Sequence, residues 1–279
     1  MKKILVTTDF SKASNAGLRF AIQLATQSDV ELVFFHCFQA LIPTTVLYER
    51  VELAMKSQGD AHMKKLEKLV ARTHRYMKIQ PGAHHCAVVE SLDPEKAILH
   101  YAEKHGFQYI CMSTRGAGAI RKVIGTHTGS VLHHATIPVL VVPHTYRVQP
   151  IKKILYSTDL EHFDKEMSIV TAFADRLNVK LDVAHFFFAG EVSLDEQNLK
   201  QLWRLKYPQL DHVYLQPYLI DKGFPAMLDQ LIKKSRPSLV TFFTHNNKTW
   251  YDKLFGASVS ENVSYATKVP MLVYRKVTG

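Results

Sequence analysis

The sequence lacks any apolar run close to the roughly 20 residues that a membrane-spanning helix needs. Residues 1–9 carry no secretory signal, because polar residues return directly after Val6 and no cleavage site follows. Three cysteines, Cys37, Cys86 and Cys111, form an odd and sparse set without a CxxC pair. This excludes a disulfide framework and predicts reduced thiols, so we expect a cytoplasmic protein with no membrane partner.

Two glycine signatures of nucleotide enzymes are also missing. The chain has no GxxxxGK[ST] phosphate loop, and no GxGxxG follows the first expected strand at residues 2–8. The adjacent pairs His84–His85 and His133–His134 do not predict a metal site, because neighbouring residues on a strand or helix point to different sides. Neither a P-loop hydrolase nor a dinucleotide-dependent oxidoreductase is therefore predicted.

Acidic residues are outnumbered, with 25 against 35 lysines and arginines, which gives a formal net charge of +10. The basic residues are scattered along the chain. Residues 64–68 read KKLEK, which is typical of the solvated face of a helix. This scatter argues against a nucleic-acid partner, whereas an anionic small ligand fits the basic balance.

The chain contains an internal repeat. KKILVTTD at residues 2–9 recurs as KKILYSTD at residues 152–159. In each copy an apolar strand then ends in a histidine followed by cysteine or phenylalanine, His36–Cys37 and His185–Phe186. A helical apolar pattern follows each aspartate, and in the second copy it consists of Ile169, Ala172, Phe173 and Leu177.

The ends of the two copies place the domain boundary. ATIPVLVVP at residues 135–143 corresponds to ATKVPMLVY at residues 266–274, and the stretch HTYRVQP at residues 144–150 interrupts the pattern between the copies. We therefore predict two domains, residues 1–145 and residues 151–279.

Apolar runs rich in β-branched and aromatic residues alternate with helical patterns in the first copy. We predict strands at residues 2–8, 30–38, 84–90, 107–113 and 138–143, and helices at residues 12–27, 48–76, 94–105 and 126–135. Asp93 and Pro94 predict a helix start, with an N-cap followed by proline at the first helical position. Apolar runs without strict alternation are typical of parallel strands covered on both faces. The sequence therefore predicts an α/β fold of two tandem doubly wound domains, each a five-stranded parallel sheet with helices on both faces.

The stretch STRGAGAIRKVIGTHTGS, residues 113–130, follows the fourth expected strand. Gly116 and Gly118 allow backbone amides to approach a ligand closely. Gly125 and Thr126 stand at the start of the next helix, whose unpaired N–H groups attract phosphate. A phosphate-binding loop and a plain strand-to-helix connector both explain these residues, and glycine content alone does not decide between them.

These segments resemble the universal stress protein family, as two copies of its domain fused head to tail. The resemblance rests on KKILVTTDFS at residues 2–11, VELVFFHCF at residues 30–38 and MSTRGAGAIRKVIGTHTGSVLHHATIPVLVVP at residues 112–143. It implies a Rossmann-like fold, similar to the adenine nucleotide alpha hydrolases, and a role in the stress response.

Nucleotide-binding members of that family share Gly-x2-Gly-x9-Gly-Ser/Thr after the fourth strand. In this sequence Gly116 corresponds to the second glycine, and Gly125 with Thr126 to the closing pair. The chain departs from the motif in two ways: Ser113 replaces the first glycine, and eight residues separate Gly116 from Gly125. We expect Ser113 to be accommodated if its φ is negative.

The resemblance implies an adenine nucleotide, ATP, ADP or AMP, in the first domain. Asp9 would lie beside the ribose and phosphates, where Mg²⁺ can bridge them, and Cys37 would contact the adenine through its backbone. The other implied nucleotide-binding residues are Thr7, Met112, Ser113, Arg115, Gly116, Gly125, Thr126, His127 and Thr128. Because no second acid accompanies Asp9, no catalytic residue is predicted, and slow ATP hydrolysis stays an alternative.

The second domain keeps Asp159 but has THNNKTWY at residues 244–251 in place of the glycine loop, so we expect it to bind no nucleotide. The family pairs its domains through their last strands, which predicts an intramolecular pseudo-dimer through residues 138–143 and 270–275. A homodimer and an unidentified protein partner are open. The alternative to a nucleotide sensor is an interaction protein in which both loops have lost the nucleotide.

Overall fold

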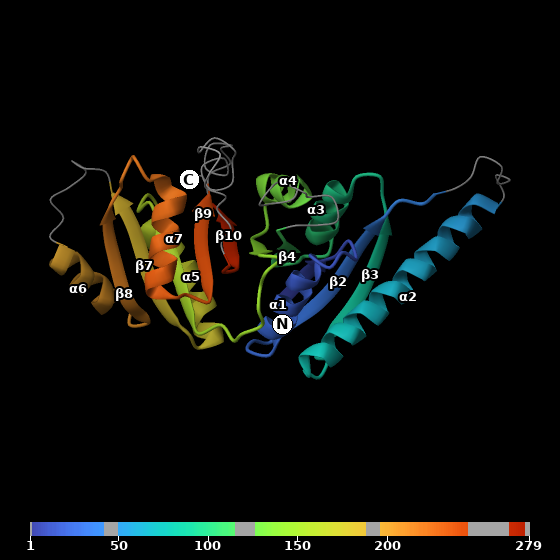
Figure 1. The fold of residues 1–279 in the computed structure, drawn as a ribbon, viewed down its shortest axis with the longest axis horizontal. Helices are drawn as coiled ribbons and strands as arrows, with labels where there is room; N and C mark the ends of the chain where they lie inside the picture. Colours follow the sequence, from blue (N-terminus) through green and yellow to red (C-terminus); the bar gives the residue numbers. More distant parts are fainter. Residues whose placement is uncertain (1, 42–49, 115–125, 188–195, 245–267, 277–279) are drawn as a thin grey trace. The chain divides into compact units, whose positions relative to one another are not determined.

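The computed structural model describes residues 2–41, 50–114, 126–187, 196–244 and 268–276. The chain divides into two compact units, Met1–Val148 and Gln149–Gly279. Each unit alternates strands with helices, so the two copies in the sequence correspond to two α/β units (Figure 1).

The first unit contains a parallel sheet of five strands in the order β3-β2-β1-β4-β5. Its register places Lys2 beside Val30 and Thr7 beside Phe35. The elements are β1 (Lys2–Thr7), α1 (Asn15–Ala25), β2 (Val30–Phe38), α2 (Val51–Met77), β3 (His84–Glu90), α3 (Pro94–Lys104), β4 (Tyr109–Ser113), α4 (Thr126–His134) and β5 (Val139–Val142).

The second unit has the same strand order, β8-β7-β6-β9-β10, and its pairs are also parallel. Its elements are β6 (Lys153–Thr158), α5 (Phe163–Leu177), β7 (Lys180–Phe187), α6 (Glu196–Lys206), β8 (Leu210–Pro217), α7 (Gly223–Ser235), β9 (Leu239–Thr244) and β10 (Met271–Arg275). The strand β6 therefore corresponds to β1, and β9 to β4.

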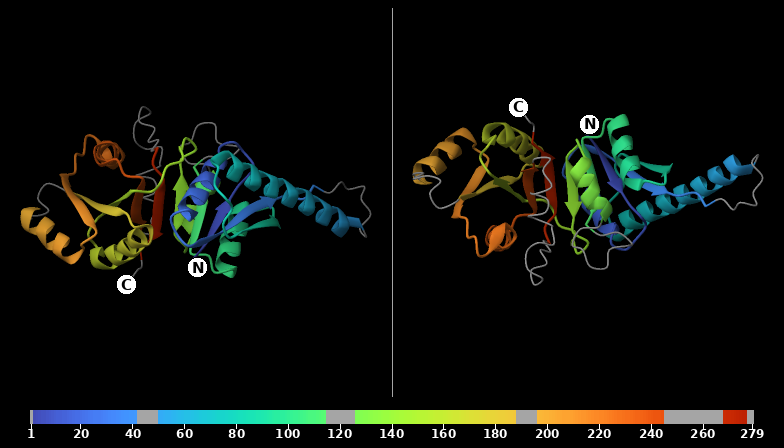
Figure 2. Two further views of the ribbon diagram at one scale, coloured as in Figure 1. Left: turned by 90° about the horizontal axis from the view of Figure 1, so that it is seen from below. Right: turned by 90° about the horizontal axis from the view of Figure 1, so that it is seen from above.

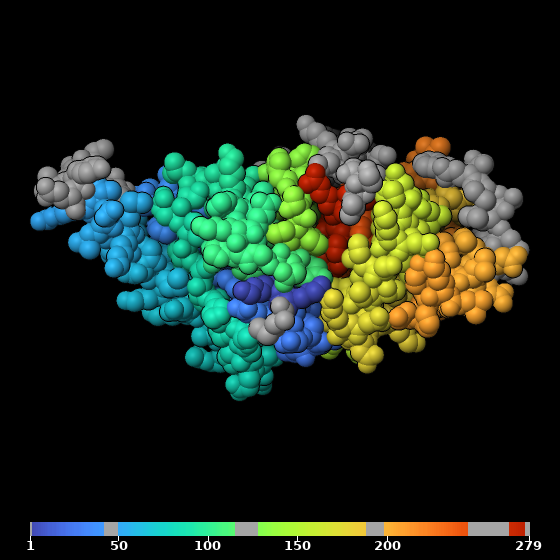
Figure 3. All heavy atoms as spheres, turned by 180° about the vertical axis from the view of Figure 1, so that it is seen from behind, coloured from blue at the N-terminus to red at the C-terminus, as the bar shows by residue number. Residues whose placement is uncertain are grey.

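Helices cover both faces of each sheet (Figure 2). In the first unit α1 packs against α2, and α3 packs against α4. In the second unit α7 lies on the face seen in Figure 1, whereas α5 and α6 form the surface seen in Figure 3. Connections between parallel strands are right-handed, so the direction in which the chain moves across the sheet decides which face a connecting helix covers. The chain reverses this direction once in each unit, which places the later helices on the opposite face.

The inner strands of both sheets are buried along most of their length, with Leu5, Phe34 and Ile110 among the side chains that lose almost all contact with solvent, whereas the edge strands β3 and β8 are largely half-buried. Continuous burial accounts for the absence of apolar–polar alternation in the sequence. The predicted α/β class with doubly wound parallel sheets is confirmed. The part of the chain that the structure describes contains no helix long and apolar enough to cross a membrane.

Two local predictions have different outcomes. Asp93 does cap α3: its Oδ1 accepts a hydrogen bond of 3.1 Å from Lys96 N, and Pro94 is the first helical residue. The predicted apolar face of α5 is wrong at Ile169 and Ala172, which are exposed. The buried face consists of Met167, Val170, Phe173, Ala174 and Leu177, with the polar Glu166.

Candidate functional site

The carboxyl ends of β1 and β4 lie side by side in the first unit. From β1 the chain continues to β2 and β3 on one side, and from β4 it continues to β5 on the other. Ligands of doubly wound sheets bind at such a reversal of strand order. The fold therefore brings the predicted residues Thr7 and Asp9, after β1, to the same edge as Met112 and Ser113, at the end of β4.

A tight turn after β1 holds Asp9. Phe10 adopts a left-handed φ of 63°, and its N–H donates to Thr8 Oγ1 at 3.1 Å. Ser11 N donates to Asp9 Oδ1 at 3.0 Å, while the Asp9 side chain is exposed. Because α1 begins only at Asn15, Asp9 stabilises the turn rather than the helix, and its carboxylate is fixed at the sheet edge.

Two histidines pack beneath this turn. His36 is buried, with Nδ1 2.8 Å from Thr8 O and Nε2 3.1 Å from His62 Nδ1. Because the Thr8 carbonyl can only accept a hydrogen bond, the proton of the neutral His36 ring is on Nδ1. His36 Nε2 therefore accepts a hydrogen bond from His62 Nδ1. Burial lowers the pKa of both imidazoles, which keeps them neutral. This pair was not among the predicted site residues, although the histidines near the ends of the corresponding strands, His36 in β2 and His185 in β7, were the available signal.

Three elements meet closely around Ser113. Its hydroxyl donates to Ala13 O at 2.8 Å, with Val142 O at 3.2 Å, and Thr128 Oγ1 donates to Ser113 O at 2.9 Å. Ser113 has no positive φ, which agrees with the expectation that serine can replace the glycine of the motif. The Ser113 and Thr128 hydroxyl hydrogens are thus used to join β4 to its neighbours.

Gly17 makes this close packing possible. A Cβ on Gly17 would lie 3.4 Å from Ser113 N and 3.5 Å from the carbonyl carbon of Met112. A larger side chain would push α1 away from the end of β4. Gly17 was not among the predicted site residues, because a glycine within a helix gives no signal until its packed neighbour is known.

The backbone of Cys37 faces the candidate site. In β2 the carbonyl of Phe35 accepts from Thr8 N, and that of Phe38 accepts from Ser91 N. Peptide groups alternate in direction along a strand, so the Cys37 N–H and C=O point toward the β1 side, past Thr7 where β1 ends. Burial raises the pKa of the Cys37 thiol to about 11, so the thiol is protonated at neutral pH.

A basic groove of about 530 Å³ begins at Phe10. Lys65 Nζ lies 4.2 Å from the centroid of the Phe10 ring, in a cation–π contact. The other groove residues come from α2, and they are Ala61, Lys64, Lys68, Leu69 and Arg72. An aromatic ring with four cations nearby attracts an anionic ligand to this side of the turn.

The second unit repeats the turn. Leu160 has a φ of 69° and donates from N to Thr158 Oγ1 at 2.9 Å, and Glu161 N donates to Asp159 Oδ1 at 3.1 Å. His185 Nδ1 lies 3.0 Å from Thr158 O, as His36 does with Thr8. The repeat in the sequence therefore encodes the same local structure twice.

The surroundings of the second turn differ. Lys276, after β10, has a side chain that is 1% exposed and an Nζ 2.5 Å from Asp159 Oδ2 and 2.8 Å from Glu161 Oε2. Glu166 Oε1 lies 3.9 Å away, and Tyr156 donates to the other oxygen of Glu166. An internal cation thus occupies the place beside Asp159, amid carboxylates that would repel phosphate.

One group of described residues has the spacing of a metal site, Asp182, Asp211 and His212 in the second unit. The Lys153 ammonium lies 3.2 Å from Asp182 Oδ2 and 3.9 Å from Asp211 Oδ2, so a cation of the protein already serves these carboxylates. At the first site Asp9 offers one carboxylate. A single carboxylate is enough for Mg²⁺ only where the phosphate oxygens of a bound ligand coordinate the same ion.

Several predicted residues cannot be compared with the structure. Arg115, Gly116 and Gly125 lie outside the described residues. Thr126 and His127 are the first two residues of α4, and their side chains are not described. The start of α4 at Thr126 agrees with the predicted helix that follows the glycine-rich stretch.

A comparison with protein families matches residues 1–143 to the model described as the universal stress protein family. A universal stress protein of Methanocaldococcus jannaschii is 29% identical over 146 residues, which cover 50% of this chain and 81% of that protein.

Two solved structures resemble the chain along almost its entire length. A universal stress protein from Archaeoglobus fulgidus has a TM-score of 0.67 with 16% identity, over 98% of both chains. A functionally unknown protein from Pseudomonas aeruginosa has a TM-score of 0.61 with 14% identity, over 99% of this chain and 92% of the other. At these identities the likeness establishes the fold.

Proposed function

Because the chain belongs to the universal stress protein family, we propose that its first unit binds an adenine nucleotide, ATP, ADP or AMP, at the carboxyl edge of β1 and β4. The observation that carries this proposal is the fixed Asp9 turn beside the end of β4, with the Cys37 peptide group on the same edge. The protein then acts in the stress response as a nucleotide sensor or interaction module rather than as an enzyme.

The proposed pose follows from the chemistry of the edge. The adenine lies against the Cys37 backbone, which offers one donor and one acceptor. The ribose lies near Thr7, Asp9 and Met112. The phosphates follow the chain from Ser113, Arg115 and Gly116 to the α4 N-terminus at Gly125, Thr126, His127 and Thr128, where helix N–H groups favour anions. Mg²⁺ would bind between Asp9 and the phosphates.

Charge supports placing the ligand in the first unit. Lys64, Lys65, Lys68 and Arg72 surround the groove next to the first turn. At the corresponding turn of the second unit, Lys276 is held by Asp159 and Glu161. A nucleotide there would have to compete with the buried Lys276 ammonium for these half-exposed carboxylates, and leaving a buried charge without its partner is costly.

One observation favours the alternative, an interaction protein without nucleotide. The Ser113 and Thr128 hydroxyls already donate to main-chain carbonyls, so their hydrogens do not serve a phosphate in this conformation. Under this alternative the glycine-rich stretch would be a connector and the edge would serve a protein partner.

Calorimetric titration of the full chain with ATP, with and without Mg²⁺, separates the two functions. We expect saturable heat and one bound nucleotide per chain. Thr126→Ala should weaken binding by about 1–2 kcal/mol, or about 5- to 30-fold, because it removes a hydrogen bond to a charged group. Ser258 stands twelve residues before Pro270, as Thr126 stands twelve before Pro138, so Ser258→Ala in the second copy is the matched control and should have no effect.

A flat thermogram at millimolar ATP, ADP and AMP would overturn nucleotide binding and support the interaction protein. Release of inorganic phosphate during prolonged incubation with ATP would identify a slow ATPase instead of a pure binding protein.

A further inference from the structure

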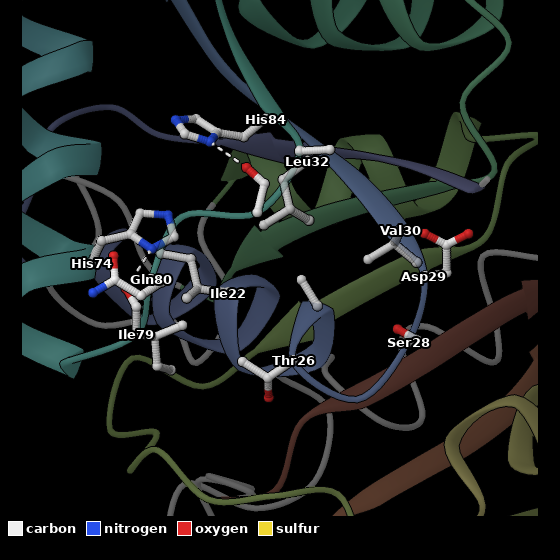
Figure 4. A pocket seen from close by; sticks show the side chains of 13 residues that line it. Ile22, Thr26, Ser28, Asp29, Val30, Leu32, His74, Ile79, Gln80 and His84 are labelled. Atoms are coloured by element: carbon white, nitrogen blue, oxygen red, sulfur yellow. Dashed lines mark hydrogen bonds between the residues drawn. The ribbon is translucent and has the colours of Figure 1, made fainter.

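A separate cleft of about 230 Å³ lies at the opposite, amino edge of the first sheet (Figure 4). It is bounded by the ends of α1 and α2 and by the starts of β2 and β3. Its apolar walls are formed by Ile22, Ala25, Val30, Leu32 and Ile79. Strands are parallel here, so this cleft lies a full strand length from the Asp9 turn.

His74 places one hydrogen-bond acceptor in this cleft. The residue is 6% exposed, and its Nδ1 lies 3.2 Å from Ile79 O. Because a carbonyl can only accept, Nδ1 carries the proton and Nε2 is left as an acceptor. Nε2 is buried and has no hydrogen-bond partner among the described residues. It points away from Ile79 O, toward the space beside Ile22 and Leu32 (Figure 4).

The end of α2 fixes the orientation of this ring. Lys78 caps the helix with a left-handed φ of 57°, and Ile79 N donates back to His74 O at 3.2 Å. This turn brings the Ile79 carbonyl against His74 Nδ1. The imidazole is thereby held in one tautomer, and burial lowers its pKa, which keeps it neutral. A buried acceptor without a partner destabilises the fold, and a ligand that donates a hydrogen bond to it would relieve this cost.

Aromatic and charge features of the cleft define the ligand further. His84 lies with its ring centroid 5.6 Å from that of His74, and its Nδ1 is 2.9 Å from Gly82 O. The two rings offer stacking partners for a flat molecule. Asp29 lines the cleft, and no lysine or arginine is found among the described lining residues. A phosphate or carboxylate ligand is therefore disfavoured.

We propose that this cleft binds a compact, uncharged aromatic or heteroaromatic molecule that donates one N–H or O–H to His74 Nε2. The size fits, because an apolar cavity of about 150 Å³ suffices for benzene. A bicyclic ring therefore fits in this cleft, whereas a complete nucleotide exceeds it. This inference is independent of nucleotide binding at the Asp9 edge.

Nitrogen-15 NMR of the full chain, with indole as the probe, tests the inference. Indole combines a flat apolar body with one N–H donor, and indene has the same shape without the donor. We expect indole to shift the His74 Nε2 resonance and the signals of Ile22 and Ile79 in a saturable way. Indene should bind about tenfold more weakly and leave the Nε2 resonance unchanged, since one hydrogen bond is lost.

His74→Phe keeps an aromatic ring but removes the acceptor, so it should reduce indole affinity about tenfold, whereas the matched control His100→Phe, at an exposed position of α3 outside the cleft, should not. The wild-type Nε2 shift tests the proposal even if His74→Phe does not fold. Equal binding of indole and indene, the absence of shifts at millimolar indole, or a water that stays bound to Nε2 when indole is added would each overturn it.

Discussion

The residues from Thr8 to Ser11 form a turn in which side-chain oxygens, rather than main-chain carbonyls, accept hydrogen bonds from the backbone N–H groups. Thr8 Oγ1 and Asp9 Oδ1 each accept from the N–H two residues later, and the same pattern recurs at Thr158 and Asp159. Such local bonds compete with helix formation. They explain why α1 begins at Asn15 rather than at the predicted residue 12.

At Gly17, the size of one side chain decides how closely α1 approaches β4. Gly17→Ala should be tolerated or raise the free energy of unfolding by up to about 1 kcal/mol, because alanine favours helix and its Cβ contacts Ser113 N at 3.4 Å. Gly17→Val should lower it by about 1–3 kcal/mol through overpacking. Urea unfolding measures both. Equal stability of the two variants would contradict this account of the contact.

Among the elements, α3 offers the clearest test of a sequence signal. Asp93→Ala removes the N-cap that accepts from Lys96 N, and we expect a loss of about 1 kcal/mol in the free energy of unfolding. Glu95→Gln, in the same first turn, is the matched control and should cost less than the cap. Denaturant unfolding followed by circular dichroism provides the measurement, and a smaller loss for Asp93→Ala than for Glu95→Gln would refute it.

The helix α5 illustrates where an apolar pattern misleads. Ile169 is apolar but exposed, whereas Glu166 is buried against Tyr156 and Lys276. Hydropathy assigned the face by residue type. The buried residues Met167, Val170, Phe173, Ala174 and Leu177 also form a regular apolar pattern, so the prediction included the wrong apolar residues at Ile169 and Ala172. Only the burial of Glu166 depends on partners outside the helix, Tyr156 and Lys276.

At the scale of the whole molecule, one buried group in each unit, His36 in the first and Glu166 in the second, should contribute pH dependences of opposite sign. Burial lowers the pKa of His36, so the unfolded state binds the proton more readily. The contribution of His36 to the first unit should therefore fall as the pH drops below about 6.5. Burial raises the pKa of Glu166, so its contribution to the second unit is present at low pH and is lost as the pH rises through the folded-state value.

Native-state hydrogen exchange measures these changes separately in β2 and β6. Relative to wild type, Glu166→Gln should remove the loss of β6 protection on raising the pH and leave β2 unchanged. His36→Gln should reduce the acid-dependent loss in β2 and leave β6 unchanged. Identical pH profiles for wild type and both variants would show that neither group governs the response. Pairing of the units through residues 138–143 and 270–275 stays a prediction.

The sequence by itself determined the fold class, the two-copy organisation and nearly every helix and strand of the first unit, since these depend on local periodicity and on residues close in the chain. The tertiary structure alone decided how the two similar turns differ: Asp159 meets Lys276, 117 positions away, and His36 meets His62 of α2. Such partners depend on how strands and helices pack, because a charge or an imidazole carries no signal in the sequence for the residue that will face it.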